Sequence, residues 1–189
     1  MSVPLYTWWL PRPRRDHYKG SFPLYFERKL LQLLGAWEGK APKPDVKILH
    51  PFGGKAEYGI RCDQNPECKA DFAHDAHALP ADWTEQFDIV ILDPPYDEGH
   101  AKRLYKAKKP RFGKYMAEAV RVCKPGGFVV HYHWYLAPRP EGCAWWGVVS
   151  VITRVFHKAR VVSIFKKEAG PMPVRGSEDM GGLFQGAKP

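Results

Sequence analysis

Short apolar runs recur along the middle of the chain and end at polar or glycine-containing turns. Runs of this length and boundary are typical of strands buried in a sheet. The strands that the pattern predicts are residues 46–49, 58–62, 71–74, 87–92, 128–134, 148–155 and 160–165. The last two are expected to pair antiparallel, since apolar and polar positions alternate in 160–165 as they do in a half-buried strand.

Helical spacing appears in two other segments. In the first, Pro23 is expected to open a helix and Gly35 to end it, and its apolar positions are Phe22, Phe26, Leu30, Leu33 and Leu34. In the second, an apolar face precedes a "KPGG" stop, and this face consists of Met116, Ala119, Val120 and Cys123.

Strands that alternate with helices predict an α/β fold with an open, mostly parallel sheet and an antiparallel pair at one edge. In such sheets ligands bind outside the carboxyl ends of the strands. The loops that matter most are therefore those after Leu49, Cys62, His74, Leu92 and Tyr132.

The chain of 189 residues is long enough for one domain with a core and short for two. We expect a basic N-terminal arm over residues 1–20, one folded domain over 21–166, and a flexible glycine- and proline-rich tail over 167–189. The formal charge of +9 points to a polyanionic partner.

Several classes of protein are disfavoured by the same composition. No stretch reaches the roughly 20 apolar residues of a membrane span, so we expect no membrane partner. Aromatic residues precede arginines at the N-terminus, which is the reverse of a signal peptide, so a cytoplasmic location is expected. The spacing of Cys62 and Cys68 is wider than in most zinc knuckles, and no metal site is expected.

The stretch "ILDPPYDEG" places an acid, two prolines and an aromatic ring directly after the apolar run 87–92. Pro94 and Pro95 stiffen the loop and remove two N–H donors, so the loop presents acceptors. The Asp93 carboxylate and the Pro94 carbonyl can accept both hydrogens of an exocyclic amine and aim its lone pair at an electrophile. Tyr96 can stack on a flipped base. The alternative is a rigid turn in which Asp93 only caps the strand.

This arrangement resembles the class I amino-methyltransferases, which use S-adenosylmethionine and carry Asp/Asn/Ser-Pro-Pro-Tyr/Phe after the fourth strand of a Rossmann-like sheet. The resemblance covers residues 20–166 and implies catalytic roles for the four motif residues, Asp93, Pro94, Pro95 and Tyr96. The leading aspartate resembles that of the DNA adenine-N6 enzymes.

Four further stretches are similar to the cofactor-binding segments of that family. "HPFGGKA" resembles the loop that binds the methionine part of the cofactor, "GSFPLYFERKLLQLL" a helix near it, "GIRCDQNP" the acid for the ribose, and "DFAHDAHALP" the turn at the adenine. The cofactor residues implied by the resemblance are His50, Pro51, Phe52, Gly53, Gly54, Asp63, Asp75 and Phe22. Each has a structural alternative: Asp63 and Asp75 as turn residues, and Phe22 and Phe52 as core.

The sequence departs from the family in two ways. His50 stands where the family has an acid, and Ala56 where it has a glycine, with a short interval between Gly54 and Asp63. The chain also has no room for a separate target-recognition domain, which implies a recognition partner protein or a homodimer.

A basic loop that follows the motif is a candidate for binding nucleic acid, because cations interleaved with rings suit phosphates and unstacked bases. Its cations include Lys102, Arg103, Lys106, Lys108, Lys109 and Arg111. A solvated charge run is the alternative. His131, His133 and Trp134 are candidates for the base pocket, with strand packing as an equal alternative.

Three functions remain open at this point. The first is a DNA adenine-N6 methyltransferase, with DNA favoured over RNA because of the leading Asp93. The second is an RNA base methyltransferase that acts on adenine N6 or guanine N2. The third is a non-catalytic nucleic-acid-binding module of the same fold, which His50 and Ala56 would explain.

Overall fold

The fold is taken from a computed structural model, in which the described residues are 2–13, 21–96 and 110–170. The predicted flexible tail lies almost wholly outside these residues. In chain order the elements are β1 (Leu5–Trp9), α1 (Phe26–Leu33), β2 (Trp37–Glu38), β3 (Ala41–Pro42), β4 (Ile48–His50), β5 (Ile60–Arg61), the 3-10 turns η1 (Pro66–Cys68) and η2 (Ala81–Trp83), β6 (Phe87–Leu92), α3 (Phe112–Val122), β7 (Cys123–His133), β8 (Cys143–Ile152) and β9 (Arg160–Lys167).

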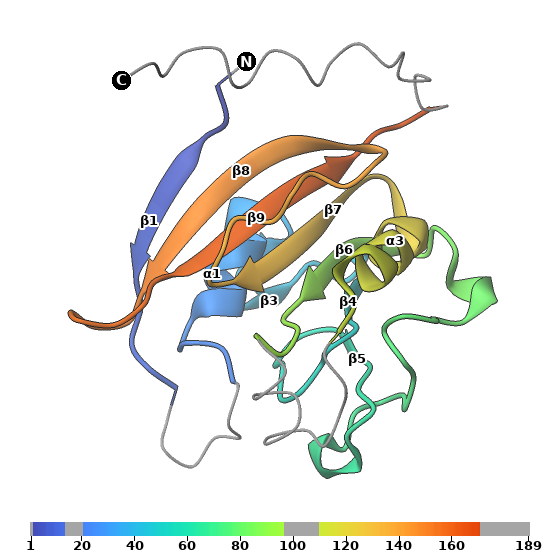
Figure 1. The fold of residues 1–189 in the computed structure, drawn as a ribbon, viewed down its shortest axis with the longest axis horizontal. Coiled ribbons are helices and arrows are strands. Elements are labelled where there is room, and N and C mark those ends of the chain that lie inside the picture. The colour runs from blue at the N-terminus through green and yellow to red at the C-terminus, as the bar shows by residue number, and fades with distance from the viewer. Residues whose placement is uncertain (1, 14–20, 97–109, 171–189) are drawn as a thin grey trace, which may run out of the picture.

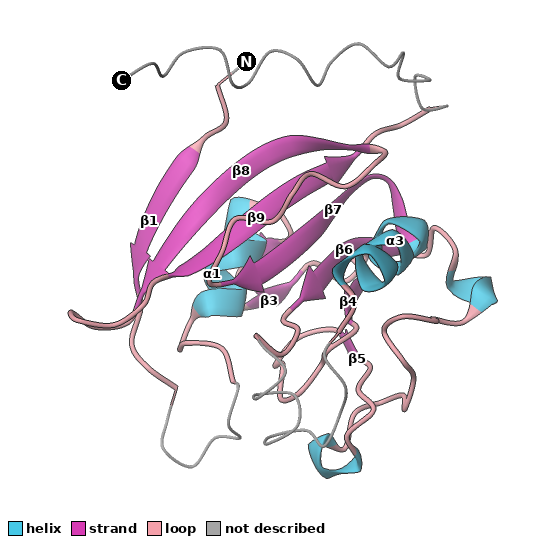
Figure 2. Cartoon of the chain, viewed as in Figure 1, coloured by secondary structure: helices cyan, strands magenta, loops and turns pink. Residues whose placement is uncertain are grey.

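Seven strands form one sheet in the order β1-β8-β9-β7-β6-β4-β5, and β2 and β3 form a separate small hairpin (Figure 1, Figure 2). Strand β9 pairs antiparallel with both of its neighbours, and the other four pairings in the sheet are parallel. The predicted mostly parallel sheet and the antiparallel pair of the last two strands are therefore confirmed. None of the helices in the described ranges is long and apolar enough to span a lipid bilayer.

Strand β1 forms the edge of the sheet beside this antiparallel pair. It pairs in parallel with β8, from Leu5 opposite Val148 to Trp9 opposite Ile152. The Trp8 ring is 6% exposed and lies 6.3 Å from the Phe26 ring, edge to face. Part of the segment expected to be an extended basic arm is thus built into the sheet, which fixes where the residues after Trp9 emerge.

The two longer helices cover opposite faces of the sheet, as Figure 2 shows. Along β6 the side chains alternate between them: Ile89 and Ile91 pack in the cluster of α1, and Val90 and Leu92 in the cluster of α3. This alternation is the ordinary consequence of the strand's two-residue period. It explains why the apolar run is continuous and why it ends abruptly at the edge of the sheet.

The predicted strand over residues 71–74 was wrong. Only an isolated parallel bridge joins Cys62 to Phe72. The Asp71 carboxylate accepts a hydrogen bond of 2.8 Å from the Arg61 backbone N–H. This bond takes the donor that a ladder would need before the bridge, and after the bridge the Asn65 N–H donates to the Asp63 carboxylate at 2.8 Å, so the pairing stops.

Helix boundaries also differ from the expected ones at two places. Helix α1 begins at Phe26, three residues after Pro23, but ends as expected at Gly35, whose φ is +71°. The Gly35 and Ala36 N–H groups bond back to Gln32 and Leu31, a Schellman end. The "KPGG" stretch does not end α3; Cys123 is already extended, and the stretch belongs to β7.

Candidate active site

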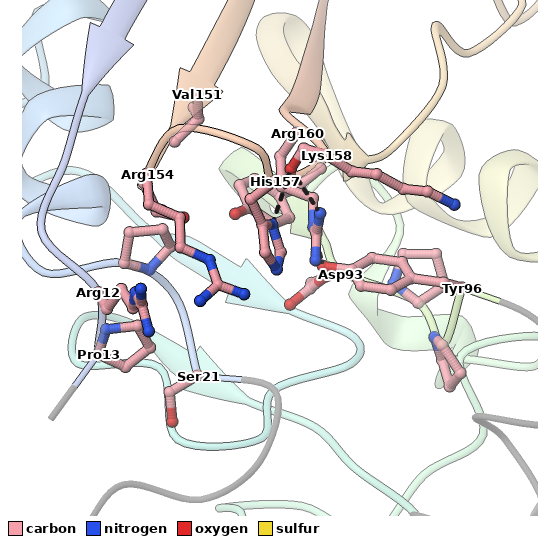
Figure 3. A pocket seen from close by; sticks show the side chains of 15 residues that line it. Arg12, Pro13, Ser21, Asp93, Tyr96, Val151, Arg154, His157, Lys158 and Arg160 are labelled. Atoms are coloured by element: carbon pink, nitrogen blue, oxygen red, sulfur yellow. Dashed lines mark hydrogen bonds between the residues drawn. The ribbon is translucent and has the colours of Figure 1, made fainter. Parts of the chain in front are cut away.

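The motif predicted from the sequence follows β6 directly, at the carboxyl edge of the parallel strands. Pro94 is buried, and Asp93, Pro95 and Tyr96 are partly exposed. A cavity of about 340 Å³ opens beside them (Figure 3). It is lined by Arg12, Pro13, Ser21, Pro23, Asp93, Pro94, Pro95, Tyr96, Tyr132, Val151, Thr153, Arg154, His157, Lys158 and Arg160.

The Asp93 carboxyl group is the one acid among the described residues that line this cavity. Surrounding protein raises its pKa well above the usual value for aspartate, although the Arg160 charge acts in the opposite direction. Burial disfavours the charged form, and a nearby cation favours it. A hydrogen-bond donor or a second cation placed in the cavity would therefore stabilise the carboxylate.

Tyr96 is held by three neighbours. Arg160 Nε donates a hydrogen bond of 2.9 Å to the Tyr96 hydroxyl, and its guanidinium carbon lies 4.7 Å from the ring centroid. Trp134 stacks on the ring at 5.2 Å with an interplanar angle of 28°, and His133 meets it edge to face at 5.0 Å. The orientation of Tyr96 is thus set by the protein; its stacking on a base remains a prediction.

The histidines predicted near the base pocket lie behind this cavity. His131 and His133 are buried, and burial lowers their pKa values to about 3 and about 4, so both are neutral near pH 7. His131 Nε2 lies 3.0 Å from the Tyr115 hydroxyl. Among the described residues, Tyr132 is the residue of this strand that lines the cavity, because it points to the opposite face from its two histidine neighbours.

The predicted cofactor loop follows β4 as a tight turn. The Gly53 N–H bonds to the Cys62 carbonyl at 2.8 Å, and an added Cβ on Gly53 would lie 2.7 Å from the Arg61 Cβ and 2.9 Å from its Cα. Glycine is therefore required for the loop to pack on β5. Phe52 contacts the Tyr115 ring edge to face at 5.3 Å.

Asp63 lies at the end of β5, as predicted, and faces the same loop. Its carboxylate accepts hydrogen bonds from the Gly54 N–H at 3.0 Å and from the Asn65 N–H at 2.8 Å. Gly54 has a φ of +45°, and no atom lies within 4 Å of the place where its Cβ would be. The loop thus presents an oriented carboxylate beside open space.

A buried acid that sequence reasoning missed also holds this loop. Glu27 of α1 accepts hydrogen bonds from the Glu57 N–H at 3.0 and 3.1 Å and a weaker one from the Tyr58 N–H at 3.4 Å. His50 Nε2 lies 2.9 Å from the Tyr58 carbonyl and 3.5 Å from the Glu27 carboxylate. The only available signal was an acid on the helical segment before the loop.

Burial controls the charge of both groups in this pair. It raises the pKa of Glu27 to about 7, against the backbone hydrogen bonds, and lowers the pKa of His50 to about 4. Neutral His50 donates its Nε2 proton to the Tyr58 carbonyl. His50 stands where the methyltransferases that the sequence resembles have an acid. It therefore supports the loop together with Glu27 of α1.

Phe22 and Asp75 lie on the two sides of this loop region. The Phe22 ring is 6.2 Å from the His50 ring and 5.2 Å from the Tyr132 ring. Asp75 Oδ1 lies 2.6 Å from His77 Nδ1, and His77 Nε2 accepts the Arg111 N–H at 2.9 Å. Since Nε2 accepts, Nδ1 carries the proton, and the chain of bonds links Asp75 to the start of α3.

Most of the predicted nucleic-acid loop lies outside the described residues, including Lys102, Arg103, Lys106, Lys108 and Lys109. Arg111 is described and exposed. Within the described ranges, no group of three or more histidine, cysteine or acidic residues is placed to hold a metal ion.

The cations that line the cavity come from two segments: Arg12 after β1, and Arg154, His157, Lys158 and Arg160 between β8 and the start of β9. The sequence interpretation placed Arg12 in a basic arm but missed the second segment. The stretch "RVFHKAR" was visible as a basic connection between two strands. Its position beside Asp93 depends on the pairing of β8, β9 and β7, which no local pattern reveals.

Comparison with known proteins supports the fold. No protein-family model and no curated protein matches this sequence. A putative class I S-adenosylmethionine-dependent methyltransferase from Listeria monocytogenes superposes with a TM-score of 0.50 at 16% identity, over 86% of this chain and 65% of that one. The 1,6-didemethyltoxoflavin N1-methyltransferase of Burkholderia thailandensis, with 1,6-didemethyltoxoflavin and S-adenosylhomocysteine bound, gives a TM-score of 0.50 at 11% identity, over 75% and 76% of the two chains. The predicted Rossmann-like class I methyltransferase fold is confirmed.

Proposed function

We propose that this protein transfers a methyl group from S-adenosylmethionine to the exocyclic amine of a nucleobase, adenine N6 in DNA being the first candidate. The observation that carries the proposal is the position of Asp93-Pro94-Pro95-Tyr96 at the end of β6, beside a cavity of about 340 Å³. In open α/β sheets ligands bind outside the carboxyl ends of the strands, where the motif after β6 and the loop after β4 both lie.

The residues around the loop fit an adenosine-bearing cofactor. The Asp63 carboxylate is oriented by two backbone N–H groups and keeps lone pairs for the ribose hydroxyls. Open space beside Gly54 permits close approach of the methionine part. Phe52 lies in the same loop, Phe22 lies next to it, and Asp75 is assigned to the adenine. When bound, the cofactor supplies an electrophilic methyl group on sulfur.

The motif prepares the amine for attack. The Asp93 carboxylate and the Pro94 carbonyl accept its two hydrogens, which localises the nitrogen lone pair that the base ring otherwise delocalises. The contribution is positioning and electrostatic stabilisation rather than strong base catalysis. A donor amine in the cavity also stabilises the ionised form of Asp93, whose pKa burial raises.

Adenine N6 in DNA is assigned on the leading Asp93, and RNA with the same chemistry is the alternative outcome of the test. The experiment measures transfer of a labelled methyl group from S-adenosylmethionine to unmodified DNA and to RNA in parallel, after calorimetry for cofactor binding. We expect label in DNA. Cofactor binding with label in neither polymer would contradict the proposal, and label in RNA alone would replace the substrate.

A further inference from the structure

The cavity beside Asp93 collects cations from segments that are far apart in the sequence. Arg12 lies just after β1, and Arg154 and Lys158 lie in the turn between β8 and β9. They meet because β1 pairs in parallel with β8, so both strands end at the same edge. Against these charges the part of the lining that the structure describes provides one acid, Asp93, whose pKa is raised by burial.

Two of the cations have interactions within the protein. Arg160 donates to the Tyr96 hydroxyl at 2.9 Å and to the Lys158 carbonyl at 3.1 Å. The Lys158 ammonium lies 4.8 Å from the centroid of the Trp134 ring. These contacts brace the β8–β9 turn against the motif, so the turn is part of the wall of the site.

The other two, Arg12 and Arg154, make no hydrogen bond or ion pair with the described part of the chain. Both side chains are exposed, and Figure 3 shows their guanidinium groups directed into the cavity on the side that faces Asp93. Two converging guanidinium groups repel each other unless an anion lies between them. Their planar donor array suits a phosphate group, which can accept two hydrogen bonds from each.

The tip of the same turn exposes an aromatic side chain. Phe156 is 107% exposed, and Val155 beside it is 66% exposed. The backbone of Phe156 has a φ of +56°, which is rare for a bulky residue and costs free energy. An exposed ring among cations is the combination that single-stranded nucleic-acid sites use, with cations on the backbone and rings stacked on bases.

We infer that this turn and Arg12 form a nucleic-acid-binding element, in which Arg12 and Arg154 bind the phosphodiester next to the target nucleotide. Phe156 stacks on the adjoining base of an unpaired or locally opened strand. The inference rests on the proposed function insofar as it places the target base at Asp93. Such an element would contribute to substrate recognition at the edge of the site, next to the nucleotide that Asp93 receives.

The phosphate contact is tested by the salt dependence of binding. Fluorescence anisotropy with a labelled single-stranded DNA and an RNA of the same sequence, without cofactor, gives the dissociation constant at several salt concentrations. For single strands each lost phosphate contact lowers the magnitude of the log–log slope by about 0.7. The variant Arg12→Ala/Arg154→Ala should therefore lower it by about 1.4.

A control variant removes the same charge elsewhere. Lys47 and Lys166 are exposed and lie at the amino ends of the parallel strands, away from the cavity. Lys47→Ala/Lys166→Ala should leave the slope nearly unchanged. Equal losses in both double variants would mean that only net charge matters, and an unchanged slope in the arginine variant would mean that the two guanidinium groups touch no phosphate; either result overturns the inference.

The stacking contact is tested with Phe156→Ala and Phe156→Leu in the same assay. Loss of one stacked base should weaken binding roughly 5- to 150-fold in both variants without changing the salt slope, because no phosphate contact is lost. The thermal midpoint should stay the same or rise, since the ring packs on nothing. Unchanged affinity would overturn the role of Phe156. Because no turnover is measured, these results are independent of whether methyl transfer occurs, and the DNA and RNA arms show which polymer binds.

Discussion

Two regions meet at the carboxyl edge of the sheet, and they differ in how their polar groups are partnered. In the cofactor loop, Glu27, His50 and Asp63 bond to backbone groups of the loop itself. In the cavity beside Asp93, Arg12 and Arg154 form no hydrogen bond or ion pair with the residues that the structure describes. The first region is held in shape by its own hydrogen bonds. The second carries positive charge that a ligand can neutralise.

The difference explains how the loop can differ from the methyltransferase loops that it resembles and keep the same architecture. His50 replaces the usual acid, but it is neutral and bonded to Tyr58, and Glu27 from α1 supplies the carboxylate from another element. In this hydrogen-bonded loop, a carboxylate that is absent at position 50 is replaced by the carboxylate of Glu27.

The largest difference between the two regions is expected for a substitution of Asp93, which lies beside the cavity. Asp93→Ala should reduce methyl transfer about 10²–10³-fold, because an oriented contact to the reacting amine is lost. Cofactor affinity should stay within about twofold of the wild-type value, since the substitution does not change the predicted cofactor loop. Single-turnover label transfer and calorimetry measure the two quantities.

The exposed Asp45→Ala serves as the control for removal of a carboxylate. It should change neither quantity. A rate for Asp93→Ala that matches the rate of Asp45→Ala would remove Asp93 from the mechanism.

A smaller effect is expected at Glu27, through pH. Its folded pKa of about 7 lies above its ordinary 4.5, so its contribution to stability is complete below pH 4.5 and is lost as pH rises toward 7. His50 acts in the opposite sense: its folded pKa of about 4 lies below 6.5, so stability is gained as pH rises from 4 to 6.5. The two contributions offset each other over much of this range.

In Glu27→Gln the contribution of Glu27 is removed, so the free energy of unfolding should rise with pH through the contribution of His50. Relative to wild type, the variant should gain up to about 3 kcal/mol of unfolding free energy between pH 4.5 and pH 7. Urea unfolding at several pH values measures this difference, with the exposed Glu38→Gln as control. A difference that does not vary with pH would show that folding does not raise the pKa of Glu27 and would contradict its burial as the controlling effect.

The smallest expected effect is a difference in stability between alanine variants of two adjacent glycines in the predicted cofactor loop. Gly53→Ala places a Cβ 2.7 Å from Arg61 Cβ and against its backbone, which should cost about 1–3 kcal/mol and weaken cofactor binding. Gly54→Ala meets no atom within 4 Å and carries only the strain of φ +45°, about 1 kcal/mol. Equal stability of the two variants in urea unfolding would contradict the packing of the loop on β5.

The sequence predicts what is local and periodic, and misses what depends on pairing. The run 87–92 was correct to the residue because a strand buried on both faces is apolar throughout and ends at a polar motif. Residues 5–9 were seen only as extended, because their status as a strand depends on β8, some 140 positions later. The third strand failed because the Asp71 and Asp63 carboxylates bond to backbone N–H groups on either side of the single bridge, contacts that propensity does not encode.

The candidate site divides along the same line. The motif and the loop 50–54 carry characteristic residue types at fixed spacing, so they can be recognised from the sequence alone. Arg12 and Arg154 are ordinary surface arginines until the parallel pairing of β1 and β8 brings their strands to one edge. Glu27 reads as a polar position of an amphipathic helix until the fold places it beneath the loop.

The central claim is that the cavity beside Asp93 receives a nucleobase and presents its exocyclic amine for methylation. The most direct test is nucleoside mass spectrometry of DNA and RNA after incubation with the protein and S-adenosylmethionine labelled in the methyl group. The account predicts labelled N6-methyladenine from DNA, formed about 10²–10³-fold more slowly by Asp93→Ala. Label on a ribose, on a ring carbon or on no nucleoside at all would contradict it.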